Sequence, residues 1–510
     1  MNTLRRRILL AGVLIAGPVL CRAGDSVLKS SEWTLRSSSG TPVKVEALVR
    51  TALQRNFGYR SAELDLAVAR ADRGAAAGEF DPALSADFNG ESRQSRLVTT
   101  PGLLPSPATV NRDWTANVAL SKQFTFGTGL TLGARSTLTE ITPQSPGYTS
   151  DVYAAVSQPL LEGLAFGSAA TAARRADLGQ MAAEADARRA MEATIATVET
   201  AYWTLREKEH LEQVSRDSLN TAQEMYDRNK KMNALKLMSD FDVLTAESGV
   251  AAREVSALDA EQARKDAMEA LVFQVYGEEA LPELRRNGLS IVTTSDELQT
   301  PQNLDEDKLM EEALSTRLDR KAAQYRLKQA EASRRSARNM ILPNLDLAGS
   351  AGGTGSRQTG GKEDLDDSLG DAADRKSKFW TLGLTFKQSI GNRTDRNRYR
   401  AAVSARDQSR LALLTVENQI RQDVRTAVRA VRYSLERLEK AARSRDLAQR
   451  QLNGEKKRLQ LGLVDSFRVL QSEDNLSQAQ RTYESARATL RRDITAYELA
   501  IGAIAKRYGQ

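Results

Sequence analysis

Residues 461–470 read Leu-Gly-Leu-Val-Asp-Ser-Phe-Arg-Val-Leu, and residues 235–244 read Leu-Lys-Leu-Met-Ser-Asp-Phe-Asp-Val-Leu. The two stretches share their apolar positions. Further upstream, Ala52-Leu53 and Pro82-Ala-Leu84 recur as Ala313-Leu314 and Pro343-Asn-Leu345, with the same distance from Ala-Leu to Pro-x-Leu each time. The chain therefore contains two copies of one unit. The distance from Pro-x-Leu to the shared stretch is longer in the first copy, so extra residues lie there.

Long stretches without proline flank both copies of the shared stretch. No proline lies between Pro159 and Pro282, and none follows Pro343. A proline inside a helix costs ~3 kcal/mol or more, so these stretches permit long helices. Apolar residues recur there every three or four positions, which is typical of coiled-coil-like packing; they are Ile195, Val198, Tyr202, Leu205, Ile420, Val424, Ala427, Val431, Leu435 and Leu438. We predict helices at about 45–78, 168–232, 239–275, 306–340, 394–459 and 466–501.

Six other stretches alternate apolar and polar residues, which predicts strands with one apolar face. They are residues 84–89, 114–120, 130–134, 152–156, 345–347 and 380–386. Aromatic residues gather in or beside them, as in the girdles of a membrane β-barrel; they are Phe88, Trp114, Phe124, Phe126, Tyr153, Phe379, Trp380 and Phe386. A soluble β-subdomain with an aromatic core would show the same alternation. Loops are predicted at about 95–111, 139–149 and 355–377.

The N-terminal stretch, 1–23, has the pattern of a secretory signal peptide. Three arginines at 5–7 are followed by an apolar stretch to Leu20, and cleavage is predicted after Ala23. A lipoprotein signal that uses Cys21 as the lipidated residue is the alternative. The apolar stretch is shorter than the ~20 residues of a transmembrane helix. Cleavage after Ala23 removes the single cysteine of the chain, so the mature chain has no disulfide.

The composition gives little support to an enzyme. The single histidine, His210, lies in a charged helical stretch, where we expect a solvated helix face. No cysteine cluster, second histidine or Gly-rich phosphate loop offers a metal, triad or nucleotide site. We therefore predict no enzymatic activity and no cofactor. A net charge of +7 would point to nucleic acid in a cytosolic protein, but in an exported chain we expect no nucleic-acid partner.

Taken together, these features resemble the TolC-like outer-membrane efflux proteins over about residues 45–502. Each copy has an Ala-Leu helix start followed by Pro-x-Leu at a strand. Residues 158–163 (Gln-Pro-Leu-Leu-Glu-Gly) and 390–393 (Ile-Gly-Asn-Arg) resemble the turns from barrel to helix, although Ser389 stands where a proline is frequent. Residues 462–470 resemble the tip of a helical hairpin, and Gly277 and Gly502 each end a copy.

The resemblance implies a mainly helical chain of duplicated helix–strand–strand–helix units that assembles as a homotrimer. Each chain would give four strands to a shared 12-stranded barrel surrounded by outer-membrane lipid, and its helices would form part of a coiled-coil tunnel through the periplasm. The channel would conduct substrates passively for a tripartite efflux pump, with a periplasmic adaptor and an inner-membrane pump of RND, ABC or MFS type as partners. The extra strand-like segments at 112–138 would either form an extracellular hairpin or lengthen the barrel.

The corresponding domain organisation has six parts. They are a signal peptide at 1–23, an N-terminal extension at 24–44, a first repeat at 45–277, a linker at 278–305, a second repeat at 306–502 and a C-terminal tail at 503–510. Strands are expected at about 82–160 and 343–390, and hairpin tips at about 233–238 and 460–465.

The resemblance also implies three groups of site residues. A periplasmic gate would use Asp242, Asp465, Arg468 and Gln471. The family has acidic residues at the last two positions, so cation preference is open here. We expect Asp242 and Arg468 to help hold neighbouring hairpins closed, against the alternative that both are solvated. An adaptor would dock on the tips, unless these residues only pack locally; they are Leu235, Leu237, Leu461, Gly462, Leu463 and Val464. Turns from barrel to helix would lie at Pro82, Pro159, Gly163, Pro343 and Gly391.

Three alternative functions fit parts of the pattern. An outer-membrane component of type I protein secretion has the same sequence features. A periplasmic adaptor would have one helical hairpin and a lipoyl-like β-region. An exported coiled-coil structural protein would leave the predicted strands unexplained.

Overall fold

The computed structural model describes residues 42–95, 109–142, 146–277, 292–293, 301, 304–358, 363–461 and 463–509. The signal peptide with Cys21, most of the N-terminal extension and of the linker, and Gly462 lie outside these residues. The described residues form two compact units. The first comprises residues 70–179 and 328–408, and the second comprises residues 42–69, 180–327 and 409–509. No helix among the described residues is both long and apolar enough to cross a membrane.

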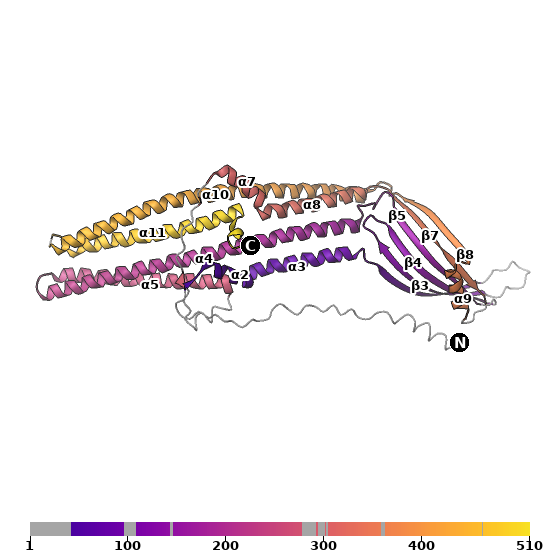
Figure 1. The fold of residues 1–510 in the computed structure, drawn as a ribbon, viewed down its shortest axis with the longest axis horizontal. Coiled ribbons are helices and arrows are strands. Elements are labelled where there is room, and N and C mark those ends of the chain that lie inside the picture. The colour runs from indigo at the N-terminus through magenta and orange to yellow at the C-terminus, as the bar shows by residue number, and fades with distance from the viewer. Residues whose placement is uncertain are drawn as a thin grey trace, which may run out of the picture. The chain divides into compact units, whose positions relative to one another are not determined.

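One antiparallel sheet dominates the first unit, with its six strands in the order β2-β3-β4-β5-β7-β8 (Figure 1). The strands are β2 (Ala83–Ser95), β3 (Thr109–Gln123), β4 (Gly129–Thr142), β5 (Gly147–Pro159), β7 (Asn344–Arg357) and β8 (Ser377–Lys387). Each of the six predicted alternating stretches falls inside one of these strands. Alternation is the expected result of a sheet with one apolar face, because successive side chains point to opposite sides.

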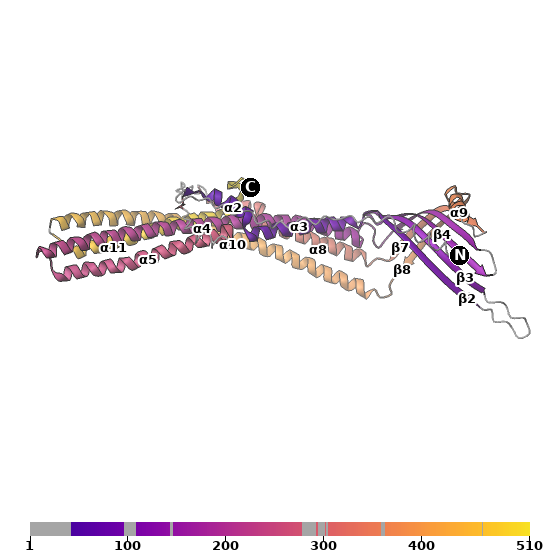
Figure 2. The ribbon, with the colours of Figure 1, turned by 90° about the horizontal axis from the view of Figure 1, so that it is seen from below.

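Two expectations for this unit were wrong. The chain contributes six strands to one sheet and not four, because the segments predicted as extra form the complete strands β3 and β4. The segment 355–377, predicted as a loop, contains α9 (Glu363–Ala373), which packs on β5 and β7 (Figure 2). A sequence rich in Asp, Ser and Gly has weak helix propensity, and contact with the sheet outweighs it here.

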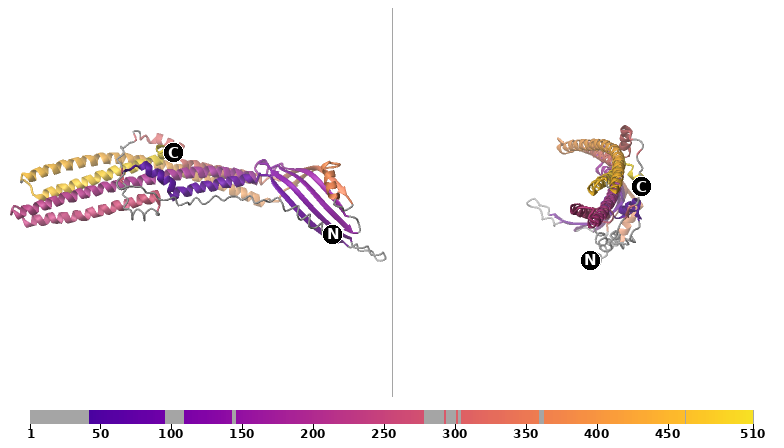
Figure 3. Two further views of the ribbon diagram at one scale, coloured as in Figure 1. Left: turned by 60° about the horizontal axis from the view of Figure 1, so that its bottom comes forward. Right: turned by 90° about the vertical axis from the view of Figure 1, so that its left-hand side faces the viewer.

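Helices make up most of the second unit. The long hairpins are α4 (Ser168–Ala234) with α5 (Asp240–Tyr276), and α10 (Arg393–Gln460) with α11 (Ser466–Ile501) (Figure 3). The shorter helices are α2 (Val45–Arg55), α3 (Phe57–Gly78), α7 (Glu306–Thr316), α8 (Leu318–Asn339) and α12 (Ile504–Arg507). Helices α3, α4, α8 and α10 contribute residues to both units. A two-stranded parallel pair, β1 (Pro42–Val43) with β6 (Val292–Thr293), completes the second unit.

The duplication holds in the structure as it does in the sequence. Helices α3 and α8 each end just before their Pro-x-Leu motif, and α5 and α11 begin at equivalent positions of the two tip stretches. The single helices predicted at 45–78 and 306–340 are each broken, at Asn56 and at Arg317. The backbone of both break residues leaves the helical conformation, with ψ of 123° and 126°. The Asn56 side chain accepts a hydrogen bond from the Tyr59 backbone N–H at 3.1 Å, which starts α3 as a new helix.

The predicted apolar seams form the core of the second unit. One cluster joins α7, α10 and α11 around Ile420, Val424 and Val431. A second joins α4, α10 and α11 near the tips, around Met225, Leu452 and Val469. The first-copy seam is buried as well, at Ile195, Val198, Tyr202 and Leu205. The three-and-four spacing thus marks the packed face of each helix.

Candidate functional site: the two-faced sheet and the hairpin tips

One face of the sheet, the apolar face, carries large apolar side chains that no other part of the described chain covers. Residues that share a face follow from the pairing register, which sets Leu84 opposite Leu120 and Leu120 opposite Leu132. The exposed members are Leu84, Phe88, Trp114, Val118, Leu120, Leu132, Val156, Trp380, Leu382, Leu384 and Phe386. Trp380 is 77% exposed. Soluble proteins rarely expose so large a contiguous apolar surface, whereas a lipid-facing sheet requires one.

The opposite side, the polar face, carries side chains that hydrogen-bond to one another across the strands. Asn117 donates to Asp87 at 3.0 Å, Arg135 donates to Asp151 at 2.8 Å, and Thr139 donates to Asp113 at 2.8 Å. Thr354 of β7 also donates to Asp151, at 2.9 Å. Polar side chains on one face and apolar side chains on the other suit a wall between water and lipid.

One end of the apolar face is covered where α9 rests on β5 and β7. Gly353 and Gly355 allow this approach, because a Cβ at either position would lie 2.1 or 2.0 Å from a carbonyl oxygen of α9. Ser150 of β5 and Ser368 of α9 are both fully buried there and share a hydrogen bond of 2.7 Å. Asp371 pairs with Arg357 and Lys376 at the edge of the contact. The hydroxyls and charges show that this part of the face is not built for lipid.

The predicted barrel-to-helix turns lie at the other end of the strands. Pro82 and Pro343 directly precede β2 and β7, and Pro159 ends β5. Gly163 and Gly391 have φ of 89° and 83°, a left-handed backbone that favours glycine. Asn339, which no pattern singled out, accepts a hydrogen bond from the Gly163 N–H at 2.7 Å and donates to the Leu161 carbonyl at 3.2 Å.

The two hairpin tips begin their second helices with side-chain caps at equivalent positions. Ser239 caps α5 and forms a capping box with Asp242, and Asp465 caps α11 by accepting from the Arg468 N–H at 3.0 Å. Asp242 and Arg468 therefore occupy the same third helical position. The carboxylate of Asp242 is engaged by the Ser239 hydroxyl at 2.6 Å, so its role within the chain is to fix this tip.

We expect Ser239→Ala and Asp465→Ala each to destabilise the start of its helix by about 1 kcal/mol, because an orphan backbone N–H loses its acceptor. The measurement is hydrogen exchange of the first-turn amides of α5 and α11. Glu247→Ala, at an exposed site two turns into α5, is the control. Unchanged protection in both cap variants would contradict the assigned roles.

The other predicted tip residues that the structure describes lie on exposed surface, with one exception. Leu235, Leu237, Leu461 and Leu463 are each about two-thirds exposed or more, whereas Val464 is half-buried. Arg468 and Gln471 are exposed on one side of α11. Sequence reasoning missed three further exposed apolar residues at the tips, Phe241, Leu244 and Phe467. The three-residue spacing of Phe241 and Leu244, outside the packed seam, is the pattern that identifies them.

A buried residue that sequence reasoning also missed joins the two tips. Asn229 of α4 is 1% exposed. Its amide donates to the Asp242 carbonyl at 3.3 Å, and its oxygen accepts from the Ser466 hydroxyl of α11 at 3.1 Å. Within one chain, the hairpins are thus tied by a buried amide. No ion pair joins the side chains of Asp242 and Arg468 among the described residues.

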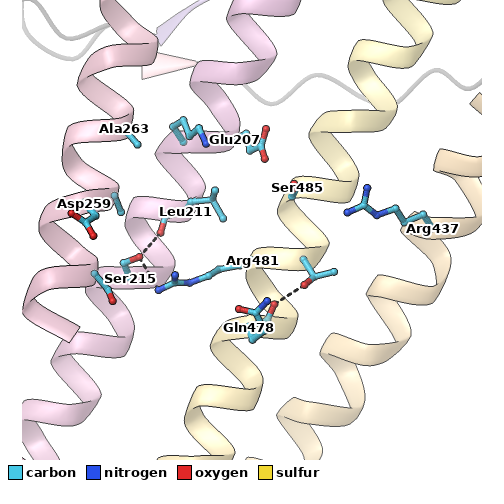
Figure 4. A pocket seen from close by; sticks show the side chains of 13 residues that line it. Glu207, Leu211, Ser215, Asp259, Ala263, Arg437, Gln478, Arg481 and Ser485 are labelled. Atoms are coloured by element: carbon cyan, nitrogen blue, oxygen red, sulfur yellow. Dashed lines mark hydrogen bonds between the residues drawn. The ribbon is translucent and has the colours of Figure 1, made fainter. Parts of the chain in front are cut away.

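Further along the same helices, a groove of about 550 Å³ opens between the two hairpins (Figure 4). Its lining includes Glu207 and Ser215 of α4, Asp259 of α5, Arg437 of α10 and Arg481 of α11. Arg481 donates to the Ser215 hydroxyl at 3.2 Å. Both signs of charge are mixed along the groove, so it offers no preference for an anion or a cation.

The structure corrects the expectation that His210 lies on a solvated helix face. The side chain is half-buried between α4 and α11, near Arg206, Glu207, Glu484, Arg487 and Arg491. Burial, with Arg206 and Arg487 nearby, lowers the pKa of His210 below its ordinary value, although Glu484 opposes this.

A lowered pKa means that the folded chain binds a proton at His210 less readily than the unfolded chain. The contribution of this group to stability is therefore complete above the unfolded pKa and declines as the pH falls toward the folded pKa. We expect His210→Gln to lose less stability than the parent between pH 7.5 and pH 5.5, measured as the thermal midpoint of the full chain. An equal fall of the thermal midpoint in His210→Gln and in the parent would contradict a lowered pKa of His210.

Comparison with known proteins agrees with this geometry. A family model described as "Outer membrane efflux protein" matches residues 309–503, which is the second copy. A comparison with curated sequences finds no match. Among solved structures, the outer-membrane channel OprN is 19% identical with a TM-score of 0.63, and the match covers 90% of each chain. The CmeC outer-membrane channel of Campylobacter jejuni is 15% identical with a TM-score of 0.64 over 93% of each chain.

The outer-membrane protein VceC of Vibrio cholerae is 16% identical with a TM-score of 0.64, and the match covers 90% of this chain and 96% of VceC. At these identities the structures establish a shared fold. The sheet and the paired hairpins exclude a coiled-coil rod and a chain with one hairpin. The resemblance to the TolC-like outer-membrane efflux proteins is therefore confirmed, by the family match over the second copy and by the fold over both copies.

Proposed function

We propose that this chain is an outer-membrane channel that assembles as a homotrimer and conducts substrates passively for an efflux pump. The observation that carries the proposal is the two-faced sheet with its open edges, β2 and β8. In lipid, an unpaired strand edge leaves backbone groups without hydrogen-bond partners, so a single chain cannot remain alone in the membrane. Pairing with further copies closes the barrel, and the polar face then surrounds water.

The helical hairpins supply the periplasmic part of the proposed channel. A passive channel needs a partner that supplies energy, and the exposed leucines of the tips offer an apolar surface for an adaptor helix. Leu235 and Leu463 belong to equivalent turns of the two hairpins. Each chain of the trimer would therefore present two such surfaces, one on each hairpin. The adaptor would link the channel to a pump in the inner membrane.

Membrane fractionation tests the proposal. We expect the full chain in the outer-membrane fraction, running on a gel as a heat-sensitive trimer. A chain found only in the soluble periplasmic fraction would overturn the proposal. Loss of drug tolerance on deletion of the gene, restored by the intact gene, would support efflux.

The gate is tested separately by the charge at its proposed constriction. Arg468 is exposed on α11, and a ring of equal charges at a narrow point sets ion preference. We expect Arg468→Asp to shift the single-channel reversal potential toward cation selectivity, because it reverses one charge in each chain of the trimer. Arg445→Asp, on the middle part of α10, is the control. An unchanged reversal potential in Arg468→Asp would place this residue outside the constriction.

A further inference from the structure

The hairpin formed by β3 and β4 is part of the sheet itself. Its pairing with β2 is continuous from Ala83–Ser121 to Ser95–Thr109, and its pairing with β5 is continuous from Gly129–Ser157 to Thr139–Gly147. Strands β3 and β4 have 15 and 14 residues. A strand needs ~9–11 residues to cross a membrane, so both are long enough.

The inserted strands also continue both faces of the sheet. Trp114, Val118 and Leu132 extend the apolar face, and Asp113, Asn117 and Arg135 extend the polar face. A hairpin that projected into water beyond the membrane would gain nothing from an exposed apolar face.

Side chains lock the hairpin to its neighbours at both joints. The Trp114 ring lies over Gly90 of β2, where a Cβ would come within 2.4 Å of it. Tyr153 of β5 lies over Gly133 of β4, where a Cβ would come within 2.7 Å of the ring. Its hydroxyl reaches across β4 to donate to Asn117 of β3 at 3.3 Å. An aromatic ring over a glycine is a device that fixes strand register.

The strand directions allow closure with further copies. Because the six strands of the sheet are antiparallel, its two edge strands β2 and β8 run in opposite directions. Strand β8 of one chain can therefore pair antiparallel with β2 of the next chain. Strand β2 is exposed at every residue, and β8 at all but one, as expected for edges that await a partner.

We infer that the barrel is a wall of eighteen strands, six from each of the three chains of the trimer, and that its pore is correspondingly wide. The inference rests on the proposed trimeric channel. Barrel diameter grows roughly linearly with strand number, so this wall is ~1.5 times as wide as one of twelve strands. The added width lies in the outer-membrane segment and would admit bulkier solutes there than a twelve-stranded wall does.

Size-graded labelling of a lumenal cysteine measures this width independently of the periplasmic gate. Ser157 and Val156 are neighbours near the helix end of β5, on the polar and the apolar face respectively. Each is changed to cysteine in a full chain carrying Cys21→Ala, and intact cells are treated with maleimides on polyethylene glycol of increasing size. We expect labelling of Ser157→Cys and none of Val156→Cys, because only the first faces water.

A deletion variant supplies the narrower wall. Removing residues 96–142 joins β2 to β5 through residues 143–146, and it preserves the alternation because Leu84 and Ala154 lie on the same face. The largest polymer radius that labels Ser157→Cys should be ~1.5-fold greater in the full chain than in this variant. Equal limits in two trimeric channels would overturn the inference and leave the proposed function intact.

Disulfides in the full chain give a second measurement if the deletion variant does not assemble. The pairs Asp87→Cys with Asn117→Cys and Arg135→Cys with Asp151→Cys are cross-strand partners and should form in the membrane. Cysteines at Asn89 of β2 and at Thr381 or Thr385 of β8 should form disulfides between neighbouring chains. The cross-linked products should contain two and three chains, and none should be larger. The eighteen-stranded wall would be overturned if the largest cross-linked product contained two chains, or if the trimer formed without the cross-strand disulfides. A chain absent from the outer membrane would overturn the proposed function instead.

Discussion

Replacing Arg317 with alanine is expected to destabilise the helical unit by about 3 kcal/mol, because it leaves the half-buried Asp319 carboxylate and the buried Ala500 carbonyl without their partner. The Arg317 side chain is only 3% exposed. It donates to Asp319 at 3.1 Å, to Asp423 of α10 at 3.3 Å and to the Ala500 carbonyl of α11 at 3.2 Å. One guanidinium thus joins the break between α7 and α8 to both helices of the second hairpin.

The charges of this cluster depend on one another. Burial works against the charged form of Arg317, yet Asp319 and Asp423 raise its pKa. Burial likewise works against the charged form of Asp319, and Arg317 overcomes this and lowers its pKa. Removal of the guanidinium therefore removes the largest of the interactions that keep Asp319 ionised in a half-buried site.

Urea unfolding of the purified full chain, followed by circular dichroism, measures this effect. Arg425→Ala is the matched control, because Arg425 of α10 pairs with Glu306 of α7 at 3.2 Å on the surface of the same unit and is 57% exposed. Exposed pairs contribute about 0–1 kcal/mol. If both variants shift the unfolding midpoint equally, Arg317 does not hold this junction together.

The second large effect is expected at the contact between α9 and the sheet. Gly355→Val would place a Cβ 2.0 Å from the Ser368 carbonyl oxygen, and the backbone of α9 has no flexible side-chain end that could yield. Overpacking of this kind costs about 1–3 kcal/mol. We expect α9 to leave the sheet, which exposes Ser150 and breaks its hydrogen bond to Ser368.

Limited proteolysis reports this release. Trypsin cleaves after Arg375 and Lys376, which lie just beyond the end of α9 at Ala373. A loss of about 2 kcal/mol corresponds to a roughly 30-fold increase in opening. Gly383→Val is the control, because a Cβ at Gly383 of β8 meets nothing within 4 Å. Equal cleavage rates in the two variants would show that α9 does not depend on the glycine contact.

Features that repeat along the chain were predictable from sequence. The two copies, the helical seams and all six alternating stretches occur in the structure where the sequence places them. The cap positions Ser239 and Asp465 are also local, since a cap and the N–H that it accepts from lie within one helical turn. A period or a cap involves near neighbours, so a single chain segment contains the information.

Features that depend on a distant partner were decided only by the tertiary structure. The alternation of β3 and β4 predicted two strands, but it could not say that they join β2 and β5 in one sheet, since any strand with the same faces is a possible partner. The charged neighbours of His210 in the sequence likewise predicted an exposed side chain, although His210 is half-buried. Nothing in the local sequence marks Asn229 or Arg317 as buried. Burial is set by the elements that pack over a residue, and these can come from the other copy of the repeat, far away along the chain.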